Sequence, residues 1–352
     1  FPEIGAHADR LCVIRSMHTD GVAHGPATLF LHCGATNAIR PSVGAWVTYG
    51  LGSENDDLPG FVSISPSIGN GGARNYGSAF LPAAVQGTAI GAAGSDGTDL
   101  NIRHLSDGRE VSASRRRIEL IRQLDREQQE RRGADDELAG AAASLDLAER
   151  MRGAAGEVFD LERETPATLA KYGIDRPETA AYGRRCLLAR RLCEAGVRFV
   201  QVNYGDNSAN PAWDQHSDLP KHATHARAVD RPVAALLSDL AERGLLDDTL
   251  VWWGGEFGRT PYAEKNGTGR DHNPNGFTVW LAGGGVKPGM TWGETDEFGY
   301  HAIRDAVHMH DLHATILHQL GIDHERLTYR FAGRDYRLTD VYGRIVRGII
   351  DG

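Results

Sequence analysis

Thr249-Leu-Val-Trp-Trp-Gly-Gly-Glu256-Phe-Gly-Arg-Thr-Pro261 is the stretch of sequence that decides the predicted fold, and Arg270-Asp-His-Asn-Pro274 follows it. An apolar run that ends in two glycines is typical of a buried strand. Glu256 comes directly after this run, where open α/β sheets place their ligands. The carboxylate of Glu256 and the imidazole of His272 are groups that a divalent metal ion binds. The alternative is that Glu256 pairs with Arg259 and that His272 is an ordinary loop histidine.

The composition limits the class of protein. The chain has 352 residues, 41% of them hydrophobic, which suits one large or two ordinary domains with a sizeable core. Its net charge of −9 gives no support for nucleic-acid binding, which requires a basic face. Because no run of about 20 apolar residues occurs, we expect no membrane span. The sequence indicates no oligomeric state.

Predicted strands and helices alternate along most of the chain. Short apolar runs predict strands over residues 10–16, 61–64, 197–203, 249–253 and 277–281. Amphipathic patterns predict helices over residues 26–33, 178–195, 218–243 and 311–320. Alternation of this kind predicts an α/β fold with a doubly wound, mostly parallel sheet flanked by helices. Residues 65–108 are rich in Gly, Ser and Asn and read as loops.

A change of composition near Glu110 divides the chain. From there to about Glu164 it is charged and rich in alanine, which predicts two or three amphipathic helices. We therefore divide the chain into an N-terminal part of the α/β core (1–109), a helical insertion or cap (110–165) and a C-terminal part of the core (166–352).

Charged side chains and histidines lie beside three successive strands of the C-terminal part. They are Asp214, His216, Glu256, Arg259, Arg270, Asp271 and His272. Because the carboxyl ends of parallel strands meet at one edge of a sheet, we expect these groups to share one crevice. The pair Asp214 and His216 is a weak signal alone, since a local Asx turn has the same pattern.

A second histidine-rich segment, His308-Met-His-Asp-Leu-His313, begins the last predicted helix. Asp311 suits the first turn of a helix, where a negative charge is stabilised. His310 and His313 would share one face of that helix. We favour capping and packing over metal ligation here. Nucleophile motifs are poor, because the chain has no G-x-S-x-G sequence and no P-loop.

Six long segments resemble the DUF1501 family, a group of uncharacterised, sulfatase-like proteins. They are Ala8–Asp20, His24–Ala27, Trp252–Pro261, Gly269–Pro274, His310–Leu317 and Phe331–Asp340. The resemblance covers nearly the whole chain. It implies a branch of the alkaline phosphatase superfamily, and with it a doubly wound α/β core of that type.

The resemblance carries over the two-metal site of that superfamily only in part. Asp214 and His216 match the first metal pair at a narrower spacing, and His272 matches the final histidine. The Asp-His-Gly motif of the superfamily falls on Glu256-Phe-Gly258, so one ligand of a second metal is lost.

The resemblance also places the nucleophile just before the helix that begins at Pro26. Ala23, His24 and Gly25 offer neither a hydroxyl nor a thiol there. The first aspartate of the superfamily would precede Phe1, and family members often carry an export signal. We therefore expect a segment ahead of Phe1 and a periplasmic or secreted location.

These residues together predict an extracytoplasmic, metal-dependent hydrolase of sulfate or phosphate esters, acting on a small-molecule or glycan ester. One divalent ion, Zn, Mn or Ca, would be bound by Asp214, His216, Glu256 and His272. His24 would act as a base or an unusual nucleophile. Arg259 or Arg270 would bind the sulfate or phosphate, whose oxygens match a guanidinium.

Two alternatives stay open. The first is a non-catalytic relative that lost the nucleophile and binds a glycan or a protein, with Trp213 and Trp292 lining its pocket. The second is a metal-dependent isomerase that resembles phosphomutases, because the gap between Glu256 and His272 resembles the short gap between ligand motifs in such enzymes. We favour the hydrolase.

Overall fold

The structure is a computed structural model of the chain, and it describes residues 1–100, 111–132, 140, 142, 146–151, 156–208, 212–264 and 267–351. Its α-helices are α1 (Pro2–Gly5), α2 (His24–Cys33), α3 (Val43–Leu51), α4 (Val111–Arg132), α6 (Pro166–Lys171), α7 (Pro177–Glu194), α8 (Lys221–Glu242) and α9 (Met309–Gln319). Its short 3₁₀ helices are η1 (Ala8–Arg10), η2 (Gly72–Tyr76), η3 (Ala83–Val85), η4 (Leu161–Arg163) and η5 (Arg347–Ile349).

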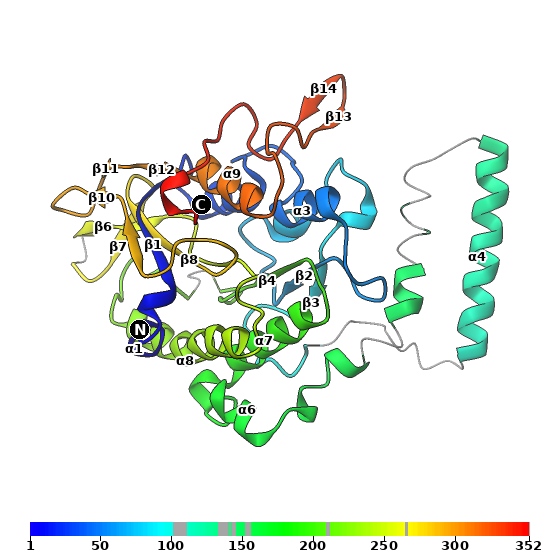
Figure 1. Cartoon of the computed structure of the whole chain (residues 1–352), viewed down its shortest axis with the longest axis horizontal. Coiled ribbons are helices and arrows are strands. Elements are labelled where there is room, and N and C mark those ends of the chain that lie inside the picture. Colours follow the sequence, from blue (N-terminus) through cyan, green and yellow to red (C-terminus); the bar gives the residue numbers. More distant parts are fainter. Residues whose placement is uncertain are drawn as a thin grey trace.

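The strands are mostly short. They are β1 (Leu11–His18), β2 (Phe61–Ile64), β3 (Thr88–Ile90), β4 (Phe199–Val202), β5 (Val251–Trp253), β6 (Gly258–Ala263), β7 (Arg270–Asn273), β8 (Phe277–Ala282), β9 (Met290–Trp292), β10 (Glu294–Thr295), β11 (Ala302–Arg304), β12 (Val307–His308), β13 (Tyr329–Phe331) and β14 (Arg334–Tyr336). Figure 1 shows their arrangement in the whole chain.

The main sheet has the strand order β12-β1-β8-β5, and β9 also pairs with β1. Strand β8 runs antiparallel to both of its neighbours, β1 and β5. Strands β9 and β12 run parallel to β1. A smaller sheet, β3-β2-β4, is parallel throughout. The pairs β6–β7, β10–β11 and β13–β14 form separate antiparallel ladders.

The predicted doubly wound, mostly parallel sheet is therefore wrong. The main sheet is mixed, and β8 at its centre pairs only in the antiparallel sense. Strands β5 and β8 are joined through the β6–β7 ladder, whereas parallel neighbours need a long crossover. A short apolar run indicates that a strand is buried, but it carries no information about the direction of the strand.

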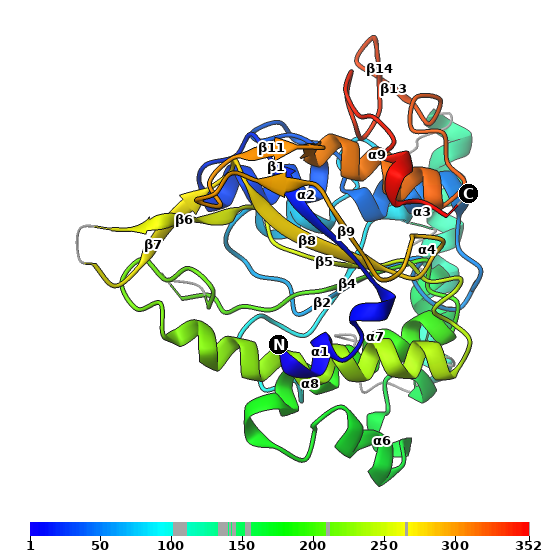
Figure 2. The same ribbon diagram turned by 60° about the vertical axis from the view of Figure 1, so that its left-hand side comes forward.

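Helices cover both faces of the main sheet, as Figure 2 shows. Alternate side chains of β8 separate the two faces, because successive residues of a strand point to opposite sides. Val279 and Leu281 pack with residues of α2 and α9, such as Phe30 and Leu312. Trp280 and its neighbours on that side pack with residues of α7 and α8. The sheet therefore lies between two helical layers, each with its own apolar core.

Most of the predicted elements agree with the structure to within a few residues. Strand β2 has the predicted bounds, and α7 begins and ends one residue before its predicted limits. Strand β3 lies in the segment that we expected to be irregular, of which residues 101–108 lie outside the described residues. Strand β7 lies where the sequence predicted no strand. Helix α4 occupies part of the predicted insertion and lies away from the main sheet in Figure 1, but the domain limits stay a prediction.

The histidine-rich start of α9 is a capping box, which confirms the capping interpretation. The side chain of His308 accepts a hydrogen bond from the backbone N–H of His310, and Asp311 accepts one from the N–H of His308. The buried rings of His310 and His313 donate through Nε2 to the carbonyls of Gly34 and Leu31, at 3.0 and 2.8 Å. These two bonds attach α9 to the end of α2.

The buried ring of His313 predicts a loss of stability in acid. Burial lowers the pKa of His313 to about 3 from an ordinary value of 6.5, so the unfolded chain binds this proton more tightly. Stability is then lost as the pH falls from 6.5 toward 3. We expect this group alone to cost about 2 kcal/mol of unfolding free energy between pH 7 and pH 5.

Urea unfolding at the two pH values measures this loss. His313→Gln should reduce the pH dependence by that amount, because glutamine does not titrate. His301→Gln, which removes an exposed histidine, should leave it unchanged. An equal pH dependence in wild type and His313→Gln would contradict the assignment.

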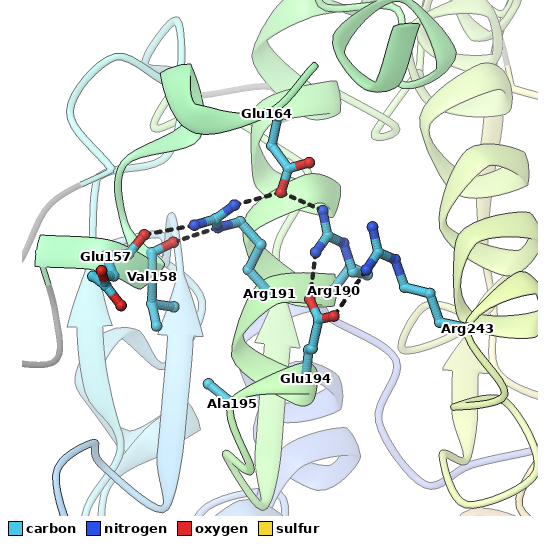
Figure 3. Close-up of a pocket in the computed structure, with 8 residues that line it drawn as sticks. All are labelled: Glu157, Val158, Glu164, Arg190, Arg191, Glu194, Ala195 and Arg243. Carbon is cyan, nitrogen blue, oxygen red and sulfur yellow. Dashed lines mark hydrogen bonds and ion pairs between the residues drawn. The ribbon is translucent and has the colours of Figure 1, made fainter.

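Three arginines connect α7, α8 and η4 in a network of ion pairs (Figure 3). Arg190 is almost fully buried and lies 2.5 Å from Glu164 Oε1, 2.5 Å from Glu194 Oε2 and 3.0 Å from Asp239 Oδ2. Arg243 pairs with Glu194 and Asp239 from the side of α8. Arg191 shares Glu164 and also donates to backbone carbonyls before η4. The charges balance, so we read this network as structural.

Loss of the Glu164 carboxylate should destabilise the fold. Burial raises the pKa of Glu164, but hydrogen bonds from Arg190 and Arg191 outweigh it and hold this pKa below the usual 4.5. Glu164→Gln should therefore cost about 2 kcal/mol of unfolding free energy at pH 7. The deficit should shrink as the pH falls through the lowered pKa, because the wild-type carboxyl is then protonated too. Exposed Glu162→Gln is the matched control in the same denaturation experiment.

Candidate metal centre

The structure gathers six of the seven predicted site residues around one buried carboxylate, although they come from five separate segments. The six are His24, Asp214, His216, Glu256, Arg259 and His272. His24 begins α2, and Asp214 and His216 precede α8. Glu256 follows β5, while Arg259 and His272 face each other as a pair on β6 and β7.

One oxygen of Asp214 is the common contact of the cluster. Four nitrogen atoms lie close to its Oδ1: His216 Nε2 and Arg259 Nη2 at 2.9 Å, His24 Nε2 at 3.0 Å and His272 Nε2 at 3.2 Å. The Nε2 atoms of His216 and His272 are also only 3.1 Å apart. Three imidazoles and a guanidinium thus converge on a single carboxylate oxygen.

The other nitrogen of each imidazole contacts an oxygen atom other than those of Asp214. His24 Nδ1 lies 2.5 Å from Glu256 Oε1, and His272 Nδ1 lies 2.8 Å from the backbone carbonyl of Val22. His216 Nδ1 contacts Glu264 Oε1. An oxygen acceptor next to Nδ1 therefore fixes the orientation of each ring.

The acidic and basic side chains of the cluster shift the pKa values of one another. Burial raises the pKa of Asp214, but the close approach of His24 and Arg259 outweighs it and holds this pKa well below its usual range. Burial likewise opposes ionisation of Glu256, whose pKa is nevertheless lowered by its hydrogen bond with His24. For His24, the two carboxylates outweigh burial and raise the pKa. Asp214 and Glu256 are thus carboxylates at neutral pH.

Phe257, at the position where a ligand of a second metal was expected, packs against the histidines. Its ring stacks on that of His272 with centroids 4.3 Å apart and lies 5.0 Å from the ring of His24. The guanidinium of Arg259 is 5.8 Å from the centre of the same ring. Phe257 therefore restricts the two imidazoles from one side.

Other predictions about the site have mixed outcomes. Arg270 lies on β7, but its guanidinium donates to the carbonyl of the neighbouring Gly269. Trp213 packs against Tyr204, whereas Trp292 belongs to the core beneath α9, and no contact in the described part of the chain joins the two tryptophans. No motif in the sequence pointed to Glu264, which directly follows β6 and contacts His216 in the fold.

The donor atoms fit a divalent metal ion. His24, Asp214 and His272 offer ligand atoms within 4.8 Å of one another, and so do His216, Asp271 and His272. Imidazole nitrogen and carboxylate oxygen are the ligands of Zn²⁺ and related ions. His24 Nε2 is also buried without a hydrogen bond, although Asp214 Oδ1 lies 3.0 Å away. A cation would satisfy this nitrogen.

A match to one known protein family covers nearly the whole chain. A sequence model described as "Protein of unknown function (DUF1501)" matches residues 1–350. The chain belongs to the DUF1501 family. No curated protein matches it. None of the described helices of this DUF1501 protein combines the length and the apolar character needed to cross a membrane.

A close approach at Gly269 holds the two ligand-bearing segments together. A Cβ at this position would lie 1.8 Å from the carbonyl oxygen of His216, and the N–H of Arg270 donates to Gln215 O at 3.1 Å. Only glycine allows the chain that carries His216 to lie against the start of β7.

Gly269→Ala should therefore force the two segments apart. We expect it to lower the unfolding free energy by about 2 kcal/mol or more, as overpacking does. Gly255→Ala is the matched control, since a Cβ there meets nothing within 4 Å, and it should change stability by under about 1 kcal/mol. Chemical denaturation of both variants measures the difference, and equal stability would show that the approach at Gly269 is not tight.

Proposed function

We propose that this DUF1501 protein is a metal-dependent hydrolase of sulfate or phosphate esters that acts outside the cytoplasm. The site supports the chemistry, and the resemblance to sulfatase-like proteins supports the substrate class and the location. The β-sheet topology lends no support, since it is not the doubly wound sheet that the resemblance implied. The proposal therefore depends on the side chains around Asp214.

The observation that carries the proposal is the convergence of three imidazole Nε2 atoms on Asp214 Oδ1, beside a guanidinium. A divalent cation held there would act as a Lewis acid on an ester oxygen. Three nitrogen donors favour Zn²⁺ over Mn²⁺ and Ca²⁺, which prefer oxygen ligands. This preference narrows the choice of ion left open by the sequence.

Arg259 is the residue best placed to bind the sulfate or phosphate group. Its Nη2 contacts Asp214, and its Nη1 donates to the carbonyl of Arg270, so the guanidinium is held at the edge of the cluster. A planar guanidinium matches the oxygens of such groups, which a lysine ammonium does less well. For Arg270 no contact in the described structure supports a role, and that assignment stays a prediction.

A surface cavity beside the cluster could receive the alcohol part of the ester. It has a volume of about 380 Å³ and is lined on one side by His24 and Asp214. The loops Ser67–Asn70 and Asp206–Ser208 form its remaining walls. These walls are mostly polar, which suits the hydroxyl groups of a small alcohol or a glycan.

A non-catalytic binding protein is the second candidate. It is favoured by Arg259, whose positive charge already neutralises Asp214, and by the lack of a hydroxyl or thiol at residues 23–25. In that case the cluster would hold its shape without a metal. The phosphomutase-like alternative has no particular support in the structure, and a phosphoryl group that stays covalently attached to the protein would indicate it.

Metal analysis and ester hydrolysis test the proposal together. The purified chain, loaded with Zn²⁺ or Mn²⁺, would be assayed on 4-nitrophenyl sulfate and 4-nitrophenyl phosphate. We expect about one equivalent of metal, with activity that is lost on chelation and restored by the ion. His272→Ala should lower activity more than about 100-fold, since losing even an outer partner of a ligand costs 10- to 100-fold.

His301→Ala removes an exposed histidine away from the cluster and serves as the control. It should retain both metal and activity. Absence of metal in the wild type, or hydrolysis unaffected by His272→Ala, would reject the hydrolase and favour the binding protein.

A further inference from the structure

We propose that one cation is bound by the Nε2 atoms of His24, His216 and His272 together with Asp214, and that Glu256 and Glu264 are positioning residues outside this ligand set. This inference deepens the proposed function and rests on it for the purpose of the ion. It differs from the set expected from the sequence, in which Glu256 was a ligand and His24 was a base or nucleophile.

The hydrogen bonds determine which ring nitrogen carries the proton. A neutral imidazole has one N–H donor and one acceptor nitrogen. A carboxylate and a backbone carbonyl can only accept, so the Nδ1 atoms facing Glu256, Glu264 and Val22 O must carry the hydrogen. In the neutral rings, all three Nε2 atoms therefore bear a lone pair.

Lone pairs in this arrangement need a cation. Those of His216 and His272 would be 3.1 Å from each other and close to a carboxylate oxygen, so a proton on one nitrogen or a metal ion between them must offset their repulsion. A proton on one nitrogen can be donated to only one of these neighbours, whereas a metal ion accepts lone pairs from both nitrogens and from Asp214 at once. A cation bound between them removes the repulsion, and it also gives the buried Nε2 of His24 its missing partner.

Among the described residues, the same contacts favour a single ion. The two possible ligand groups share His272, and the Nδ1 of His272 is already bonded to Val22 O. His272 therefore has one nitrogen to offer, and it can serve only one ion.

Glu256 and Glu264 are placed to orient the rings. Each accepts from the Nδ1 of a histidine, which fixes the ring and makes its Nε2 a better donor to a metal. The Oε1 of Glu256, at 2.5 Å from His24, is already engaged in this way. Val22 O provides the corresponding acceptor for His272.

Zinc affinity of the full chain tests the inference without reference to activity. Zn²⁺ would be titrated against a chelating dye for the wild type, Glu264→Ala, Glu264→Gln and the control Glu297→Gln, an exposed glutamate. We expect Glu264→Ala to weaken binding about 10- to 100-fold. Glu264→Gln should lose less, because its amide oxygen can still accept from Nδ1, and the control should match the wild type.

Nitrogen-15 NMR of the histidine rings supplies a readout that general loss of structure would not produce. On addition of Zn²⁺ the Nε2 signals of the three histidines should shift as coordinated nitrogens do, while their Nδ1 atoms stay protonated. Unfolding curves of each variant check that the fold is retained.

The outcomes separate this inference from the proposed function. Zinc affinity unchanged in Glu264→Ala, or Nδ1 coordination by NMR, would overturn the inference while leaving a metal-dependent hydrolase intact. Complete loss of binding in Glu256→Gln would make Glu256 a direct ligand and would also overturn it. The expected affinities without any ester hydrolysis would keep the metal centre and reject the hydrolase. A wild type that binds no zinc would reject both.

Discussion

The buried carboxylate of Asp214 is the common contact of three imidazoles and a guanidinium that come from separate parts of the chain. Without its negative charge, the side chains of Arg259 and the three histidines would have no common partner. The pKa of this carboxyl group stays low despite its burial because His24 and Arg259 lie beside it. The cluster is therefore a mutual arrangement, in which every member depends on the positions of the others.

The main sheet provides the rigid frame for this arrangement. Strand β5 ends shortly before Glu256 and so places this residue at the edge of the main sheet. The β6–β7 ladder that follows brings Arg259 opposite His272. The segment with Asp214 and His216 reaches the same place by lying against Gly269, where a side chain would not fit. Helix α2 adds His24 from the opposite layer. Antiparallel pairing of β6 with β7 thus returns the chain from Arg259 to His272.

The histidines of this chain serve two different purposes. In α9, His310 and His313 use Nε2 to bind backbone carbonyls of α2, and burial keeps the ring of His313 neutral. In the candidate centre, Nδ1 meets the acceptor and Nε2 faces inward. The nitrogen that binds the surrounding structure therefore distinguishes a packing histidine from a candidate ligand, and sequence spacing does not show it.

The sequence by itself determined the positions of most helices and strands, the lack of support for nucleic-acid binding, and the five residues that gather around Asp214. These depend on local periodicity, on charge and on motifs, all of which can be read along the chain. Only the tertiary structure decided the direction of β8, the β6–β7 pairing, the contact of Glu264 with His216 and the separation of Arg270 from the cluster. Each of these depends on which distant segments pair and in what sense, and a buried strand has the same apolar pattern in either direction.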